Sequence, residues 1–113
     1  MNIQIFGKSK CFDTKKAERY FKERGIKVQS VDILQKGLSP GEFNNIKQAV
    51  GGLDALIDNK SSAYAASFIA HLSSIEAKEE KLMEMPALFK TPIVRNGKQA
   101  TIGYAPEVWK TWS

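Results

Sequence analysis

The sequence predicts an α/β fold built on one four-stranded mixed sheet, and two segments support that prediction. Residues 2–34 have the pattern of a strand, a helix and a second strand, which implies a parallel pair joined by a right-handed crossover. Residues 91–102 have the pattern of two short strands around Asn96-Gly97, the strongest two-residue signal for a hairpin with a type I′ turn. A parallel pair and an antiparallel hairpin combine into a mixed sheet, which helices must cover.

A change of hydrophobic period defines the first unit. Residues 2–6 alternate polar and apolar side chains, as a half-buried strand does. From Thr14 the apolar residues recur at helical spacing, while charged residues occupy the opposite face. We expect Gly25 to end this helix, because glycine is favoured directly after a helix C-terminus, and residues 27–34 to form the second strand.

The helix-start signals and helical spacing in residues 36–89 predict a helical insertion between the two halves of the sheet. Ser39-Pro40-Gly41-Glu42 has the signature of a helix start, with a capping serine, proline at the first helical position and glutamate three residues after the cap. We expect another helix that starts within residues 59–62 and has Leu72 on its apolar face. A serine of the pair at 73–74 is expected to cap one more helix.

The predicted order of elements is strand, helix, strand, a helical block, two strands and a closing helix at 106–112. This is the thioredoxin/glutaredoxin arrangement with extra helices between its two halves. In the closing helix, we expect Trp109 and Trp112 to pack on the sheet or on the chain end rather than to form a partner-binding patch. A chain of 113 residues has the ordinary size of a single domain, so we expect one domain, residues 1–113.

Composition narrows the classes of function. The chain is 42% hydrophobic and 26% charged, as soluble globular proteins are, and it has no apolar run long enough for a membrane helix. Its start lacks the features of a signal peptide, so we expect a cytoplasmic protein without membrane association. We also expect a monomer. The net charge of +5 suits an anionic ligand or an acidic partner. The basic residues are spread along the chain, so direct binding to nucleic acid is not expected.

One cysteine and one histidine limit the chemistry further. Cys11 has no partner for an internal disulfide, and Cys11 and His71 cannot form a metal site by themselves. We therefore expect no metal and no bound cofactor. His71 is expected on or near the apolar face of a helix, as a partly buried packing residue rather than a general base.

Cys11 lies between the first predicted strand and the first predicted helix, in the kind of loop where function concentrates. The free N–H groups and the dipole of a helix N-terminus favour a thiolate, and they also suit an oxyanion. Lys8 and Lys15 would add positive charge, and Thr14 could cap the helix or donate its hydroxyl to the sulfur. The alternative is that Cys11 is a buried apolar side chain without a chemical role.

Several short motifs, in a shared order, resemble the ArsC/Spx family of glutaredoxin-linked arsenate reductases and their relatives. They are Cys11-Phe12-Asp13-Thr14-Lys15-Lys16-Ala17, the segment 39–42, the segment 56–64, and the segment 91–97 followed by Ile102-Gly103-Tyr104 and Trp109. The resemblance covers nearly the whole chain. It implies a thioredoxin-like fold, Cys11 as the reactive residue and a cis peptide bond at Thr91-Pro92 beside it.

The resemblance implies two kinds of function. One is a thiol oxidoreductase in which Cys11 attacks an oxidised substrate or a glutathione mixed disulfide, with glutathione or glutaredoxin resolving the adduct. The other is an Spx-like regulatory or interaction protein, with RNA polymerase as its partner. Thr14 stands where Spx-type regulators often have a second cysteine, so an intramolecular redox switch cannot form here.

Arsenate reductases of this family also use three arginines, and this chain departs from that pattern. By position, Asp58 (or Lys60), Thr91 and Tyr104 stand in their place. A charge-assisted contact contributes roughly 1.5–3 kcal/mol, so the sequence predicts much weaker capture of arsenate. Lys60 and Arg95 are the cations that could substitute in part, although for Arg95 we favour a solvated position on the hairpin.

Overall fold

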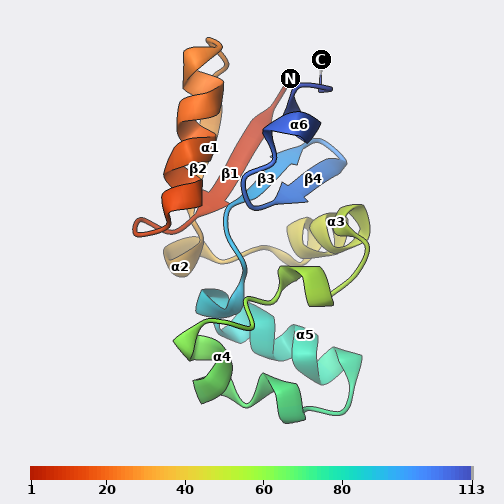
Figure 1. Cartoon of the computed structure of the whole chain (residues 1–113). Coiled ribbons are helices and arrows are strands. Elements are labelled where there is room, and N and C mark those ends of the chain that lie inside the picture. The colour runs from red at the N-terminus through yellow and green to blue at the C-terminus, as the bar shows by residue number, and fades with distance from the viewer. Residues whose placement is uncertain (113) are drawn as a thin grey trace.

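In the computed structural model, which describes residues 1–112, four strands form one mixed sheet (Figure 1). β1 (Ile3–Gly7) lies between the parallel strand β2 (Val28–Asp32) and the antiparallel strand β3 (Ile93–Asn96). β4 (Gln99–Ile102) pairs with β3, so the strand order is β2-β1-β3-β4. The α/β fold with a mixed four-stranded sheet is thus confirmed.

Helices cover both faces of this sheet. α1 (Phe12–Glu23) and α6 (Pro106–Trp109) pack on one face, and α3 (Pro40–Val50) packs on the other, where it contacts β4. Trp109 and Trp112 are buried with the side chains of α1. The prediction that both tryptophans pack on the sheet is therefore confirmed.

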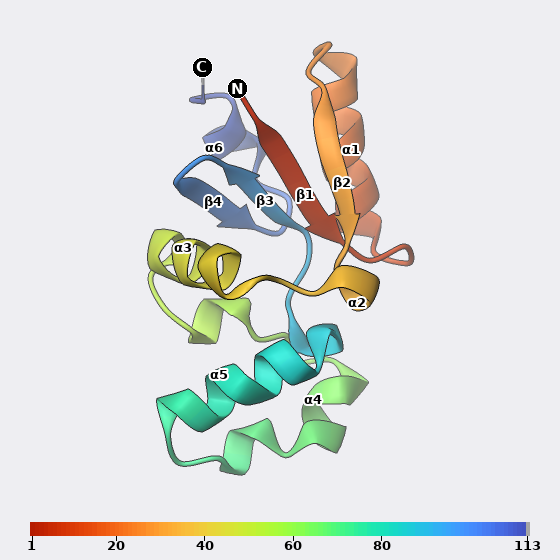
Figure 2. The same ribbon diagram turned by 180° about the vertical axis from the view of Figure 1, so that it is seen from behind.

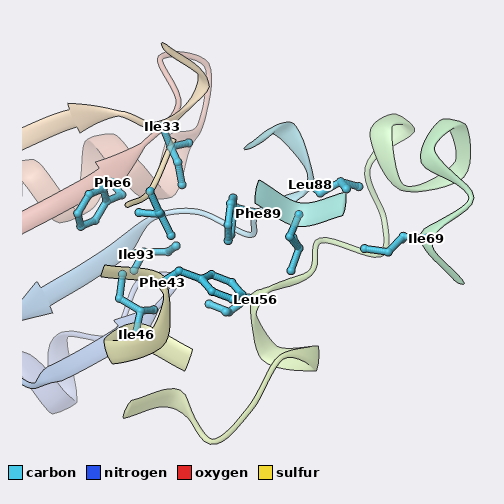
Figure 3. Close-up of a cluster of buried hydrophobic side chains, with 11 residues drawn as sticks. Phe6, Ile33, Phe43, Ile46, Leu56, Ile69, Leu88, Phe89 and Ile93 are labelled. Carbon is cyan, nitrogen blue, oxygen red and sulfur yellow. The ribbon is translucent and has the colours of Figure 1, made fainter. Parts of the chain in front are cut away.

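Neighbouring residues of the central strands point into two separate cores, because successive side chains of a strand alternate between its faces. Ile5 and Val94 belong to the cluster under α1 and α6, whereas Phe6 and Ile93 belong to the cluster that joins the sheet to the insertion. Figure 3 shows this second cluster, in which the side chains of Phe6 and Ile93 from the sheet lie close to side chains of the insertion such as Phe89. The apolar face of the insertion is therefore buried against the sheet itself.

The insertion consists of short helices, most of which begin at a serine. Besides α3, it contains α2 (Ile33–Lys36), α4 (Ser62–Ser67), α5 (Ile75–Glu84) and three short 3₁₀ turns, η1 (Asp54–Leu56), η2 (Ile69–His71) and η3 (Pro86–Leu88). Ser39 and Glu42 form the predicted capping box at the start of α3. Ser61 caps α4 and Ser74 caps α5. α4 and α5 lie at the end of the molecule opposite both termini (Figure 2).

Of two predicted boundaries on either side of β2, the helix end before it is confirmed and the end of the strand itself is not. Gly25 follows α1 with φ +69°, as predicted for a glycine after a helix. The second strand ends earlier than predicted, because Asp32 caps a new helix by accepting a hydrogen bond from the Leu34 N–H at 3.0 Å.

Among the residues that the structure describes, no helix has the length and apolar composition needed to cross a bilayer.

The hairpin forms as predicted, but its turn lies one residue later. Asn96 pairs with Gln99 on β4 and with Ile3 on β1, so it is held in the strand from both sides. The two loop residues are therefore Gly97 and Lys98. Gly97 has φ +60° and Lys98 does not have positive φ, which is the pattern of a type II′ turn rather than the predicted type I′.

The helix predicted to reach Leu72 ends early. α4 stops at Ser67, whose hydroxyl accepts a hydrogen bond from the Ile69 N–H at 3.2 Å, and Phe68 takes a left-handed conformation with φ +57°. This break turns Phe68 outward, so that it is 67% exposed, and it leaves His71 on the surface. The prediction of a partly buried His71 on an apolar helix face is therefore wrong.

Candidate active site

Cys11 lies in the loop between β1 and α1, at the end of the sheet that faces the insertion (Figure 1). It occupies the N-cap position of α1. Its N–H donates to the carbonyl of Lys8 at 3.0 Å, and its carbonyl accepts from the N–H of Lys15 at 3.3 Å. Its side chain forms no capping hydrogen bond, so the sulfur remains available at the positive end of the helix dipole.

The start of β3 lies beside Cys11, because β3 runs antiparallel to β1. Phe6 pairs with Ile93, so the residues that precede β3 meet the loop that follows β1. There the Cys11 thiol donates to the backbone carbonyl of Thr91 at 3.6 Å. The Thr91-Pro92 peptide bond is cis, as the resemblance predicts.

Thr14 is buried in the first turn of α1, three residues after Cys11. Its side chain packs so closely on β1 that a Cβ at Gly7 would lie 2.2 Å from Thr14 Cγ2. The absence of a side chain at Gly7 therefore permits this approach. Thr14 Oγ1 is buried and has no hydrogen-bond partner among the described residues, which is costly for a hydroxyl unless it serves another state of the site.

The pKa of Cys11 lies below its ordinary value of 9.0, through opposing causes. Burial raises the pKa, because it penalises the charged thiolate. The side chain of Thr14, then that of Thr91, and then the backbone N–H groups of Thr14 and Asp13 lower it by hydrogen bonding, and they prevail. The buried Thr14 hydroxyl, which has no other partner among the described residues, is thus a group that can donate to the thiolate.

The two predicted lysines next to this loop differ in their contacts. The Lys8 ammonium donates to the carbonyls of Ala87 and Phe89, at 3.0 and 2.9 Å. Lys15 is exposed on the first turn of α1, where it lines a groove of about 370 Å³ together with Lys8 and Thr14. The groups that lower the pKa of Cys11 are hydroxyl and N–H donors, and neither lysine is one of them.

A model of the ArsC family matches residues 6–112, a span that includes Cys11, Thr14 and the Thr91-Pro92 bond. The chain belongs to the ArsC family. The resemblance of its short motifs is confirmed by this match, which extends from the end of β1 through α6.

Known relatives in and around the ArsC family are of two kinds. The global transcriptional regulator Spx 2 of Oceanobacillus iheyensis is 32% identical over 109 residues, which cover 92% of this chain and 78% of that protein. An arsenate reductase from Vibrio cholerae has a TM-score of 0.84 at 25% identity, covering 96% of this chain and 94% of that one. An arsenate reductase (ArsC) related protein from Brucella melitensis has a TM-score of 0.71 at 18% identity, covering 99% and 94%. The thioredoxin-like fold of ArsC proteins is thus confirmed for this chain.

Arg95 does not lie at the cysteine end of this ArsC fold. It pairs with Gln4 near the start of β1, whereas Cys11 follows the end of that strand. Its guanidinium donates to the side chains of Asn45 and Gln4, at 2.9 and 3.0 Å, and to the carbonyl of Gly97 at 3.1 Å. The expectation that Arg95 supports the sulfur is wrong, because the antiparallel register of β3 places it at the hairpin, where it joins the sheet to α3.

Lys60 lies in the insertion, in the turn before α4. Its N–H donates to Asp58 Oδ1 at 3.2 Å, and its side chain is exposed. Within residues 1–112 the structure shows no hydrogen bond or ion pair formed by its ammonium. Lys60 therefore remains a prediction as a partial substitute for a family arginine.

The turn after β4 adds two residues to the cysteine end of the sheet. The Gly103 N–H donates to the Pro92 carbonyl at 2.8 Å, which fixes the turn beside the cis bond. Tyr104 follows, and the Lys16 ammonium lies 5.6 Å from the centre of its ring. From the sequence, Lys16 was expected only on the charged face of a helix. The contact with Tyr104 was missed because the two residues are distant in the chain and only the register of the sheet brings them together.

Proposed function

We propose that this ArsC-family protein is a thiol oxidoreductase with Cys11 as its nucleophile. The observation that supports this most is the pairing of Cys11 at a helix N-terminus with the buried, unpartnered hydroxyl of Thr14. Donors directed at a sulfur favour its thiolate, and the thiolate is the nucleophilic form of cysteine. The proposal includes no general base, because a lowered pKa increases the fraction of Cys11 that is present as the thiolate.

The proposed reaction is thiol–disulfide exchange with a glutathione mixed disulfide. The Cys11 thiolate attacks the glutathione sulfur, a new sulfur–sulfur bond forms, and the substrate leaves as a thiolate that takes up a proton. The thiolate of a second glutathione, or of a glutaredoxin, then attacks the Cys11 adduct and releases Cys11 as a thiolate. Overall, one thiol and the mixed disulfide become the substrate thiol and a new disulfide that contains the transferred glutathione, so electrons balance without a bound cofactor.

Arsenate is a weaker candidate substrate. Thr91 and Tyr104 are uncharged, although the resemblance predicts arginines at these positions in arsenate reductases of the family. The Lys16 ammonium lies over the Tyr104 ring, 5.6 Å from its centre. We therefore expect glutathione-linked disulfide exchange to proceed faster than glutaredoxin-coupled reduction of arsenate.

The test is the pH dependence of alkylation of the protein by iodoacetamide, followed by turnover. Because Cys11 is the only cysteine, the alkylation rate reports its thiolate alone. We expect a midpoint below that of free glutathione, a Cys11–glutathione adduct by mass spectrometry, and turnover that Cys11→Ser abolishes. A midpoint at or above that of a free thiol, or equal turnover in Cys11→Ser, would overturn the proposal.

A second candidate function is regulation through protein contacts, with RNA polymerase as the partner. It is favoured by the 32% identity to a protein named as a global transcriptional regulator. The test is co-elution of the full chain with purified RNA polymerase. Binding that Cys11→Ser retains, in a protein without thiol turnover, would favour regulation over catalysis.

A further inference from the structure

The Lys8 side chain joins two segments that are far apart in the chain. Its ammonium donates to the carbonyls of Ala87 and Phe89, which are 79 and 81 residues away. Lys8 lies on the loop between β1 and Cys11, and its two acceptors lie on the segment that leads into Thr91 and β3. The contact therefore spans the two sides of the cysteine site.

The segment that Lys8 contacts is firmly held. Leu88 and Phe89 are buried in the core between the sheet and the insertion (Figure 3). The Leu88 carbonyl accepts from the Asp58 N–H at 2.8 Å, and the Lys90 N–H donates to the Leu56 carbonyl at 2.8 Å. Because this backbone is fixed on its other side, the Lys8 contact sets the position of the cysteine loop relative to it.

The groups that accept hydrogen bonds from Lys8 indicate whether this residue holds the cysteine loop in place or acts on the thiolate through its positive charge. Both are neutral backbone carbonyls, and Lys8 forms no ion pair among the described residues. Thr91, two residues after Phe89, accepts from the Cys11 thiol through its carbonyl, and its side chain forms a hydrogen bond that lowers the pKa of Cys11. A loop that moved away from this segment would separate Cys11 from Thr91 even if the charge of Lys8 stayed nearby.

We propose that Lys8 is a positioning residue, which holds the cysteine loop against the 87–89 segment so that Thr91 faces the sulfur of Cys11. Lys8 acts through Thr91 and does not touch the reacting atoms. This inference rests on the proposed role of Cys11 as a nucleophile. It replaces the sequence-based expectation that Lys8 stabilises the thiolate directly by its charge.

The experiment compares Lys8→Met with Lys10→Met. Both variants lose one positive charge, but Lys10 is exposed and adjacent to Cys11, and none of its side-chain atoms donates a hydrogen bond in the described residues. Alkylation of Cys11 by iodoacetamide is followed across pH at about 0.01 M and about 1 M salt, where screening lengths are roughly 30 and 3 Å. Circular dichroism confirms folding, and Lys8→Gln, which is too short to reach both carbonyls, replaces Lys8→Met if that variant does not fold.

We expect Lys8→Met to slow alkylation at pH 7 about threefold to tenfold at both salt concentrations, the size of one lost hydrogen bond. Lys10→Met should have a small effect that disappears at high salt. Equal effects of the two variants that disappear at high salt would overturn the positional role, and so would a wild-type rate in Lys8→Met. A wild-type protein whose thiol titrates like free glutathione would instead overturn the proposed role of Cys11.

Discussion

The thiol of Cys11 donates to the backbone carbonyl of Thr91 at 3.6 Å, and this contact joins two loops that are 80 residues apart in the chain. One side of the sulfur is therefore formed by the first turn of α1, which is local in sequence. The other side is formed by the segment before β3, which only the sheet register brings there. The reactivity of Cys11 depends on both sides.

Thr14→Val should affect reactivity and stability in opposite directions. It removes a donor that lowers the pKa of Cys11, so the pKa should rise and alkylation at pH 7 should slow. It also removes a buried hydroxyl without a partner, so the free energy of unfolding should stay equal or rise by about 1–3 kcal/mol. Urea denaturation and alkylation against pH measure the two effects. Thr14→Ser, which keeps the hydroxyl, should keep the pKa, and an unchanged pKa in Thr14→Val would contradict the role of the hydroxyl.

The stability of the reduced protein should increase with pH relative to that of Cys11→Ser. The folded thiol has a lowered pKa, so it loses its proton at a pH where the unfolded thiol, with an ordinary value of 9.0, still holds it. The additional stability is fully present above pH 9, and it is lost as the pH falls through the lowered folded pKa. Urea denaturation of both proteins at several pH values measures the difference, and a difference that is constant or falls as pH rises would contradict the lowered pKa.

Gly7→Ala should destabilise the protein by about 1–3 kcal/mol, because the added Cβ would lie 2.2 Å from Thr14 Cγ2 and neither β1 nor α1 can yield easily. Adding Thr14→Ala should recover most of this loss by removing the atoms in conflict. Gly41→Ala is the matched control, since nothing lies within 4 Å of its Cβ. Thermal denaturation measures all three, and equal stability of Gly7→Ala and wild type would show that the close packing is not rigid.

Arg95→Gln should change stability without changing the chemistry of Cys11. It removes guanidinium hydrogen bonds to Asn45, Gln4 and Gly97, so the free energy of unfolding should fall by about 1–3 kcal/mol. Lys98→Gln loses the same charge on the exposed hairpin and should have little effect. The alkylation rate of Cys11 should match wild type in both variants, and a clear fall in Arg95→Gln would restore the rejected role for this arginine.

Phe68→Gly should stabilise the protein by about 1 kcal/mol. A left-handed conformation is unfavourable for phenylalanine and costs nothing for glycine, and Phe68 is 67% exposed, so little burial is lost. Phe68→Ala keeps the unfavourable backbone and should not stabilise. Chemical denaturation compares the three proteins, and a loss of stability in Phe68→Gly would indicate that the exposed ring, whose centre lies 6.2 Å from that of His71, contributes to packing.

The features predicted correctly from the sequence are those that neighbouring residues decide. The capping box at Ser39 depends on residues within one turn, and the helix end at Gly25 depends on one glycine. The errors arose where distant contacts compete with a local signal. Asn96 favours a turn by itself, but pairing with Ile3 and Gln99 keeps it in the strand.

Hydrophobic period and short motifs are local properties, so they were sufficient to predict the order of the strands, the family and the place of Cys11 at the start of α1. The residues that surround the sulfur depend instead on tertiary contacts. The antiparallel register of β3 brings Thr91 to Cys11 and takes Arg95 to the opposite end, and the packing of the insertion directs Lys8 to the carbonyls of Ala87 and Phe89. These contacts join residues about 80 positions apart, so no local pattern specifies them.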